Sequence, residues 1–323
     1  MILPPPPVDV CPVAMQELSG LTSDGKQFFA VSDSDNGTLR IQVMGRDCVV
    51  KRTITAPVDP YDVEDLAMTP DGTLWASDTG DNNKSRSTVA LHKVSPSGAV
   101  ERFRVTYPDG KHDAEALLVD KTGTPYIITK EPLGSALVYR PTAPLRTDAP
   151  VPLEQVGRVS LSTTDTPGGP LEGTLDSRLV TGAASTADGS VIALRTYTDA
   201  YLFPVPDGDP KGAVAQALAG DPVRVPLPNE PQGEAIAFDP DGTLLSASEG
   251  AGTAIRAVTG AASLAQPAAP TTTTPPPPAA GQPQAAPPES SNGSWQNWPL
   301  ALTLGGIVLA AALVIGLRFR RRA

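Results

Sequence analysis

A glutamate stands eight residues before the glycine of an expected turn at four places in the sequence, and a threonine stands there at a fifth. The five positions are Glu17, Glu64, Glu115, Thr181 and Glu234. In each repeat a short apolar run, the turn and a second apolar run follow. Carboxylates supply the oxygen ligands that calcium prefers, and they can also act as acids or bases. The repeated spacing makes these glutamates the first candidates for a site.

The distances between repeats indicate how these residues are positioned. Successive repeats begin 47, 51, 66 and 53 residues apart, and each holds about four short runs rich in β-branched and aromatic residues. Periods of about 40 to 50 residues with four strands are typical of propeller blades. A loop over residues 162–178, rich in Thr, Gly and Pro, explains the longest interval. We predict an all-β protein, a β-propeller of five four-stranded blades.

The predicted propeller domain covers residues 8–259, and its last repeat holds only three strands. The segment 8–13 could supply the fourth strand, so that both ends of the domain share one blade. Such closure removes exposed sheet edges. A six-bladed ring stays open as an alternative if sequence upstream of Met1 adds strands. No segment of ten residues shows a convincing helical period, and the nearest is the short alanine-rich stretch 212–220.

In a propeller the innermost strand of each blade starts at one mouth of the axial channel, and the second strand ends there. This geometry predicts an acidic ligand-binding cluster at that mouth, with two cationic partners. Its expected members are Glu17, Asp33, Glu64, Asp78, Asp81, Glu115, Lys130, Arg195, Glu234 and Glu249. Asp62 and Asp113 lie close to it in sequence.

Carboxylates this close together need protons or a cation to neutralise them. We therefore expect Ca²⁺ as a possible cofactor, held by Glu17, Glu64, Glu115 and Glu234. A second interpretation also stays open, in which these glutamates accept backbone N–H bonds from neighbouring blades and hold the ring together. The fourth repeat breaks the ring of acids with Thr181 and brings Arg195, which could orient an anionic substrate or pair with the glutamates.

Charge and motifs exclude several function classes. The net charge is −10, which argues against nucleic acid as a partner. The two cysteines and two histidines have no zinc-site spacing, and no nucleophile motif with a histidine base is present. In an exported chain, Cys11 and Cys48 are expected to form a disulfide that ties the first strand to the first blade.

The ends of the chain indicate a membrane protein. Residues 260–296 form a Pro/Ala/Thr-rich segment with little to bury, which predicts a disordered stalk. Residues 297–317 end in a charge-free run long enough to cross a bilayer as one helix, and the tail 318–323 carries four arginines. The arginines place the C-terminus in the cytoplasm and the propeller outside the cell. Residues 1–7 contain no export signal and are expected to be disordered, so we expect the signal upstream of Met1 or already removed.

Three stretches resemble a family of exported actinobacterial β-propeller proteins with WD40-like repeats, whose members are mostly uncharacterised. They are TYPDGKHDAEALLVD (106–120), VTGAASTADGSVIALRTYTDA (180–200) and PQGEAIAFDPDGTLLSASEG (231–250). The resemblance spans most of residues 11–256, including both cysteines and the loop TGDN at 79–82. More distantly, the chain looks like the esterase-like phytase propellers. The resemblance implies the propeller fold and transfers no catalytic residue.

Two functions are compatible with these features. The first is a non-catalytic, membrane-anchored extracellular module that binds a ligand, a cell-wall component or another protein through the acidic mouth. The second is a calcium-dependent hydrolase of phosphoesters or other esters, similar to phytases, in which Lys130 and Arg195 bind the anion. The long stalk and the lack of a recognisable catalytic set favour the first, so we lean against an enzyme.

Overall fold

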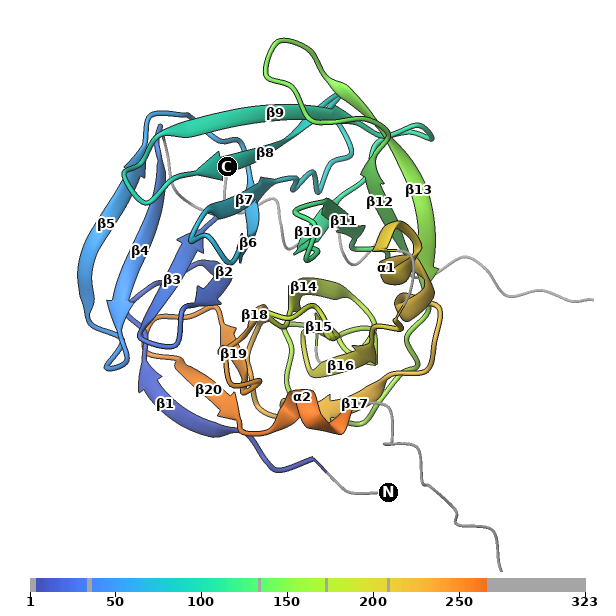
Figure 1. The fold of residues 1–323 in the computed structure, drawn as a ribbon. Helices are drawn as coiled ribbons and strands as arrows, with labels where there is room; N and C mark the ends of the chain where they lie inside the picture. Colours follow the sequence, from blue (N-terminus) through green and yellow to red (C-terminus); the bar gives the residue numbers. More distant parts are fainter. Residues whose placement is uncertain (1–3, 34–36, 133–134, 172–173, 208–209, 266–323) are drawn as a thin grey trace, which may run out of the picture. The chain divides into compact units, whose positions relative to one another are not determined.

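The computed structural model describes residues 4–33, 37–132, 135–171, 174–207 and 210–265 (Figure 1). The chain separates into two compact parts, Met1–Pro270 and Thr271–Ala323, and the second lies outside the described residues. The predicted membrane span at 297–317 and nearly all of the predicted stalk therefore fall outside the description. No helix among the described residues is long and apolar enough to cross a membrane.

The described strands group into antiparallel units of four, numbered here as sheet units 1 to 5. Unit 1 consists of β2 (Leu18–Ser23), β3 (Gln27–Ser32), β4 (Leu39–Gly45) and β5 (Val50–Ala56). Unit 2 consists of β6 (Val63–Met68), β7 (Leu74–Asp78), β8 (Val89–Val94) and β9 (Val100–Thr106). Unit 3 consists of β10 (Ala114–Val119), β11 (Pro125–Thr129), β12 (Ala136–Pro141) and β13 (Val151–Val159). Unit 4 consists of β14 (Val180–Ser185), β15 (Val191–Thr196), β16 (Asp199–Pro204) and β17 (Val223–Pro226). Unit 5 consists of β18 (Gly233–Phe238), β19 (Leu244–Ser248), β20 (Ala254–Val258) and β1 (Val8–Pro12).

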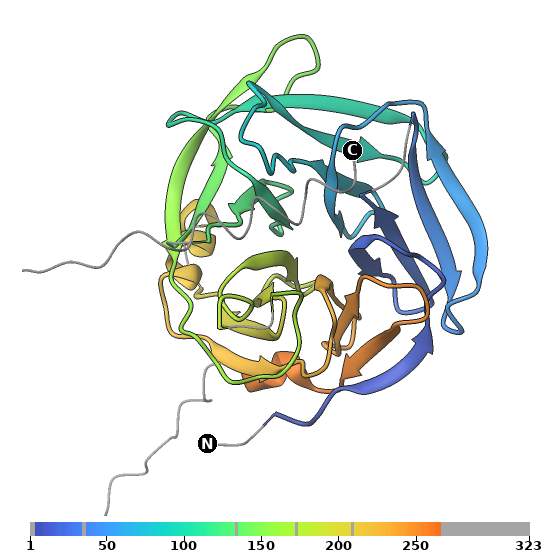
Figure 2. The ribbon, with the colours of Figure 1, turned by 180° about the vertical axis from the view of Figure 1, so that it is seen from behind.

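The units are arranged around a common axis as in a β-propeller, with β2, β6, β10, β14 and β18 innermost (Figures 1 and 2). Hydrophobic clusters fill the spaces between consecutive units, and the cluster around Leu18, Phe28 and Leu245 joins unit 5 back to unit 1. Units 2 and 3 also share a short parallel contact between β9 and β13, so they form one eight-stranded sheet. All these clusters lie within Met1–Pro270, so this part holds a complete core of its own.

The two ends of the folded part meet in unit 5, as predicted. Strand β1 pairs antiparallel with β20, with Val8 opposite Ala257. The predicted disulfide between Cys11 and Cys48 is present and links β1 to the turn before β5 in unit 1. The last and first units are therefore joined by a strand pairing and by a covalent bond.

Two helices modify the expectation of an entirely β domain. Helix α1 (Pro210–Leu218) buries Ala213, Val214, Ala217 and Leu218, which recur at helical spacing, and the last three pack into the core between units 3 and 4. Helix α2 (Ala261–Leu264) lies beyond the predicted domain end at residue 259. Its alanines are buried between units 4 and 5, so the folded part extends through residue 265 instead of ending at 259. The start of the segment 260–296 is predicted as stalk because alanine alone does not distinguish a short packed helix from a linker.

Candidate functional site

Each innermost strand contains a β-bulge at its second residue. The register with the second strand shifts there in all five units, so the bulged residue has no partner opposite it. The bulged residues are Ser19, Glu64, Glu115, Thr181 and Glu234. Three of the four glutamates selected by their spacing therefore occupy equivalent positions at the start of an innermost strand.

Glu17 does not occupy the equivalent position, and this corrects the prediction that it begins an innermost strand. Strand β2 starts at Leu18, and the bulged residue of unit 1 is Ser19. The turn between β2 and β3 covers residues 24–26, whereas the turn between β6 and β7 covers residues 69–73. Because the first turn is two residues shorter, counting back from its glycine reaches a residue two positions too early.

Hydroxyl groups connect neighbouring units at this end of the channel. Ser19 Oγ donates to the carbonyl oxygen of Val63 at 2.8 Å, and Thr181 Oγ1 donates to that of Gly233 at 2.8 Å. Thr79, just after β7, donates in the same way to Ala114 at 2.7 Å. Each acceptor is the first residue of the next innermost strand. Hydroxyl residues thus perform the ring-holding role that was considered for the glutamates, and no backbone N–H of the described residues donates to Glu64, Glu115 or Glu234.

A buried acidic cluster lies where units 2 and 3 meet. Carboxylate oxygens of Glu64, Asp113 and Glu115 lie within 4.8 Å of one another, and the three residues are 8%, 6% and 4% exposed. Burial, and then the charges of Glu115 and Asp62, raise the pKa of Glu64 well above its ordinary value. Burial raises the pKa of Glu115 to about 7, although Lys130 opposes this rise. Glu115 Oε2 is buried and accepts no hydrogen bond from any described residue.

Asp62 extends this cluster toward solvent. Its carboxyl group is partly buried, and its negative charge contributes to raising the pKa of Glu64. Burial and the charge of Asp113 raise the pKa of Asp62 to about 6. Gly80 leaves the space for this pair, since a Cβ there would lie 2.0 Å from Glu64 Oε1 and 2.4 Å from Asp62 Oδ2.

Lys130 is a cation of the mouth that pairs directly with one of these acids. Its Nζ donates to Glu115 Oε1 and lies 5.1 Å from the ring centroid of Tyr197. Burial alone would lower the pKa of Lys130, but the negative charges of Glu115 and Glu234 contribute to raising it well above its ordinary value. Glu234 accepts a hydrogen bond from Gln232 at 3.1 Å, and burial and Glu115 raise its pKa. One lysine therefore faces several carboxyl groups and cannot neutralise them all.

A second acidic group lies between units 5 and 1. Glu17, Asp33 and Glu249 bring carboxylate oxygens within 4.8 Å of one another, and all three residues are partly exposed. Burial and the charges of Asp33 and Glu17 raise the pKa of Glu249 to about 8. Glu17, although not at the bulge, therefore still belongs to the mouth.

Asp78 and Asp81, two of the predicted ligand-binding residues, are held by the loop that follows β7. Asp78 accepts hydrogen bonds from Arg86 at 2.8 Å and from the backbone N–H of Asp62 at 3.1 Å, and it contacts His92. Asp81 accepts from the backbone N–H groups of Ser85 and Arg86 at 2.7 and 2.8 Å. Burial would raise the pKa of Asp78, but His92 and Arg86 lower it overall. Both carboxylates already have partners that fix the loop.

Arg195 does not reach the channel mouth, which corrects its predicted role in binding a ligand. It is 0% exposed, and its guanidinium donates to Glu230 at 2.7 Å. The remaining guanidinium bonds go to backbone carbonyl oxygens of Thr196, Tyr197, Ala235 and Ala247. The residue of unit 4 equivalent to Lys130 is Tyr197, two positions further along, as the register of β15 shows.

The sequence does contain a signal for this placement. Gly182 lies opposite Arg195, and a Cβ on Gly233 would lie 1.6 Å from Arg195 Nη2. Glycines on two neighbouring innermost strands thus leave the volume that the buried arginine fills.

Asp65 is a buried acid that the spacing argument missed. It is 0% exposed and accepts backbone N–H bonds from Leu66, Leu117 and Ala183 at 2.8, 2.8 and 3.1 Å. These donors lie on the innermost strands of units 2, 3 and 4, so the side chain crosses the channel. Burial raises the pKa of Asp65 to about 8 against the effect of these bonds. The available signal was a second acid directly after Glu64 in a strand whose other residues are apolar.

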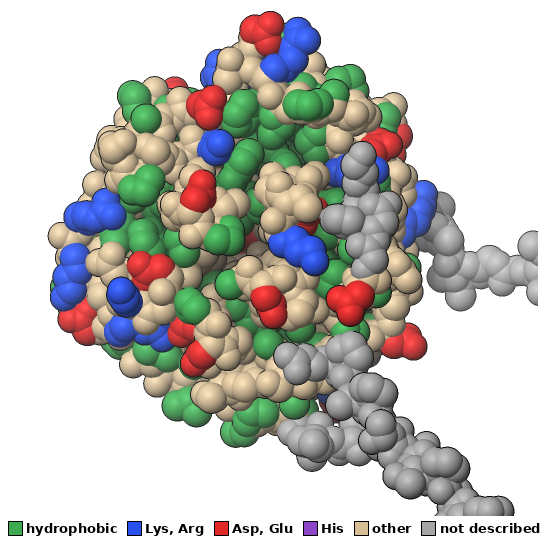
Figure 3. Space-filling model, viewed as in Figure 1, with side chains coloured by type: hydrophobic (Ala, Val, Ile, Leu, Met, Phe, Trp, Pro, Cys, Tyr) green, Lys and Arg blue, Asp and Glu red, His purple; other side chains and the backbone are tan. Residues whose placement is uncertain are grey.

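The surface outside the mouth shows no comparable concentration of charge in the view of Figure 3. On that face, acidic and basic side chains are interspersed with apolar ones.

Comparison with known proteins gives distant likenesses only. No family model matches the chain, and no curated protein matches it. Among solved structures, a gluconolactonase from Xanthomonas campestris is 13% identical over 79% of this chain and 86% of its own, with a TM-score of 0.43. A luciferin-regenerating enzyme is 14% identical over 75% and 78%, with a TM-score of 0.43. A nidogen/laminin complex is 13% identical over 72% and 73%, with a TM-score of 0.40. The chain is thus similar to diverse proteins, and its site is interpreted from its own residues.

Proposed function

We propose that this protein is a membrane-anchored extracellular binding module, a five-bladed β-propeller whose acidic mouth binds a divalent cation. One observation carries the proposal: three buried carboxylates converge within 4.8 Å, and one oxygen among them, Glu115 Oε2, has no hydrogen-bond partner among the described residues. Buried polar atoms in native proteins normally have partners, and buried charges are paired or bind metals. A cation is the partner that this cluster fits.

The donor set favours calcium over a transition metal. Glu64, Asp113 and Glu115 would hold the ion, and all of their donor atoms are carboxylate oxygens. Calcium would supply the positive charge that Lys130 cannot provide alone. The module then binds its extracellular ligand, a wall component or another protein, through the mouth that the ion organises.

The alternative of a calcium-dependent phosphoesterase receives less support from the geometry. That function was expected to use Lys130 and Arg195 to bind the anion. Arg195 is buried and all of its guanidinium bonds go to Glu230 and backbone carbonyl oxygens, and Lys130 is paired with Glu115. The anion would therefore have to displace an existing ion pair.

Calorimetric titration of the Met1–Pro270 part with Ca²⁺ and Mg²⁺, combined with thermal melting, tests the cation site. Ca²⁺ should bind and raise Tm, because a ligand that binds only the folded state stabilises it. Glu115→Gln should remove both effects. Glu101→Gln, at an exposed position on β9, is the matched control and should retain them. Absence of heat and of a Tm shift in the unmodified protein at millimolar Ca²⁺ contradicts the proposal.

A further inference from the structure

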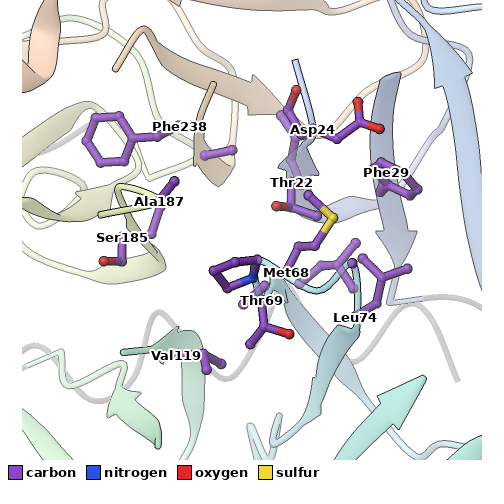
Figure 4. A pocket seen from close by; sticks show the side chains of 18 of the residues that line it. Thr22, Asp24, Phe29, Met68, Thr69, Leu74, Val119, Ser185, Ala187 and Phe238 are labelled. Atoms are coloured by element: carbon purple, nitrogen blue, oxygen red, sulfur yellow. The ribbon is translucent and has the colours of Figure 1, made fainter. Parts of the chain in front are cut away.

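The end of the channel opposite the acidic mouth is hollow. A cavity of about 510 Å³ opens among the ends of the innermost strands and the turns that follow them. Ligand pockets commonly have volumes of about 300–1,000 Å³. Side chains from separate units, including Met68, Val119, Ser185 and Phe238, border this common space (Figure 4).

Two levels of side chains build the cavity, because residues two apart on a strand share a face. Nearest the middle of the channel lie Leu21, Leu66, Leu117, Ala183 and Ile236. Two residues further along lie Ser23, Met68, Val119, Ser185 and Phe238. Strand β14 contributes the smallest apolar side chain at the first level and a serine at the second. Space is therefore left on the side of unit 4.

Asp65 lies between this cavity and the acidic mouth. Its carboxylate spans β6, β10 and β14 at the level of Leu117 and Ala183, through the hydrogen bonds described above. All three bonds come from backbone N–H groups of innermost strands, so these strands hold the Asp65 carboxylate in place. The cavity is consequently a separate site with its own chemistry.

The cavity also extends outward between units 1 and 2. Phe29, Ile54 and Leu74, which belong to the hydrophobic cluster between these units, line this arm. The arm reaches Arg52, an exposed residue on β5. The space is therefore elongated and mostly apolar in its interior.

The charges at the rim differ in how they are used. Asp24 accepts backbone N–H bonds from Lys26 and Gln27, and Asp120 accepts several bonds within its own turn. Arg52 and Lys121 line the cavity and are exposed, and their side chains form no hydrogen bond or ion pair with another described residue. The rim thus offers cations to a ligand, while its two acids hold turns.

We propose that this cavity binds a small, elongated amphiphile with an apolar body and one anionic end, such as a fatty-acid-like molecule. The apolar levels and the arm between units 1 and 2 take the chain, and Arg52 or Lys121 takes the anionic group at the rim. This site is independent of the cation site, since the two lie at opposite ends of the innermost strands.

Fluorescence titration of the Met1–Pro270 part with parinaric acid and with its methyl ester tests the proposal. The acid should bind with a gain in emission. Ala183→Leu and Ser185→Val should each weaken its binding about tenfold or more, because filling the space removes contacts worth more than 1.4 kcal/mol. Leucine already occupies the Ala183 level in units 1, 2 and 3, and valine occupies the Ser185 level in unit 3, so the fold should accept both. Ala219→Leu, at an exposed position after α1, is the control and should bind normally.

A second set of variants tests the binding of the ligand's anionic group at the rim. Arg52→Gln combined with Lys121→Gln should weaken binding of the acid about threefold or more and leave the ester unchanged, as expected for partly exposed charge pairs. Arg146→Gln, exposed and outside the cavity, should change neither. Absence of binding by both probes, or normal binding by folded Ala183→Leu and Ser185→Val proteins, would overturn the site. An ester that binds as tightly as the acid would overturn the anionic end.

Discussion

Two groups of buried charges in this protein differ in how they are neutralised. At the contact between units 4 and 5, Arg195 pairs with Glu230, and all of its guanidinium bonds go to Glu230 and backbone oxygens. Glu230 also accepts from Ser246 at 2.6 Å. At the contact between units 2 and 3, Glu64, Asp113 and Glu115 face one lysine, and Glu115 Oε2 has no hydrogen-bond partner among the described residues.

The degree of neutralisation distinguishes charges that stabilise the fold from charges that are available to a ligand. A saturated ion pair contributes to stability in its present form and has no capacity for a ligand. An acidic cluster with excess charge is costly until a proton or a cation binds. Charged residues alone therefore do not mark the site; incomplete neutralisation does.

The largest expected effect is a loss of stability when the ion pair between Arg195 and Glu230 is removed. Arg195→Met should lower the free energy of unfolding by about 3–5 kcal/mol, because it leaves the buried Glu230 with only the longer contact to Arg256, at 3.5 Å, as a cationic partner among the described residues. Urea unfolding of the Met1–Pro270 part measures this loss. Arg146→Met is the control, since Arg146 is 58% exposed and pairs only with Asp148. A loss no greater than that of the control would show that the two groups do not differ as described.

The stability contributed by the acidic groups of the mouth should fall as the pH rises. Burial raises the pKa of Glu115 to about 7 and that of Glu249 to about 8, from ordinary values of 4.5. The folded state therefore binds these protons more tightly than the unfolded state does. Their stabilising effect is complete below about pH 4 and is lost as the pH rises through about 7 to 8.

Thermal melting in the presence of a chelator should accordingly show Tm falling between about pH 5 and pH 8. Several groups contribute, so the change should exceed that of any single substitution in the cluster. Calcium added at pH 8 should restore Tm by replacing the lost protons. A Tm that is constant or rises over this range without calcium would contradict the assignment of excess negative charge.

Glu64→Gln should stabilise the cation-free protein at pH 8 by about 1 kcal/mol, because it removes a buried charge that is repelled by Glu115 and Asp62. The same isosteric change on the saturated side, Glu230→Gln, should destabilise the protein, because it removes the charge that Arg195 needs. Urea unfolding measures the change in the free energy of unfolding for both variants. Changes of the same sign in Glu64→Gln and Glu230→Gln would contradict the difference between the two groups of charges.

The smallest effect concerns the hydroxyl groups that join neighbouring units. Ser19→Ala should cost about 1 kcal/mol, since it removes one buried hydrogen bond to the carbonyl oxygen of Val63. Calcium binding should stay unchanged, because Ser19 is not in the acidic cluster. Ser97→Ala, at an exposed turn, is a suitable control and should unfold like the unmodified protein. Altered calcium affinity in Ser19→Ala would mean that the bulge itself shapes the site.

Much of the propeller could be predicted, because its signals are local and repeated. Strand runs such as those at β8 and β12 follow from their β-branched and aromatic residues, and the turn glycines follow from their positive φ angles. The pairing of β1 with β20 followed from the missing fourth strand of the last repeat. Three of the four repeat glutamates occur at equivalent bulges for the same reason.

Other features could not be read from local patterns. Glu17 is not at a strand start, although its spacing predicts one. The turn of unit 1 is shorter, so eight residues back from its glycine is two residues before the bulge. Arg195 was assigned to the mouth because a two-residue displacement along β15 turns a channel position into a buried one. The cavity could not be predicted from the sequence, because it depends on the sizes of side chains at the same level in all five units. These side chains are far apart in the sequence.

The sequence by itself determined the β-propeller architecture, the joined ends and the placement of Glu64, Glu115 and Glu234 at strand starts, since repeated spacing and strand-forming residue types act over short distances. Tertiary structure alone decided which charges are neutralised. Arg195 meets Glu230, 35 residues away, and Asp65 meets Ala183, 118 residues away. Neutralisation depends on partners brought together by ring closure, so the acids that remain available to a ligand become identifiable only in the folded protein.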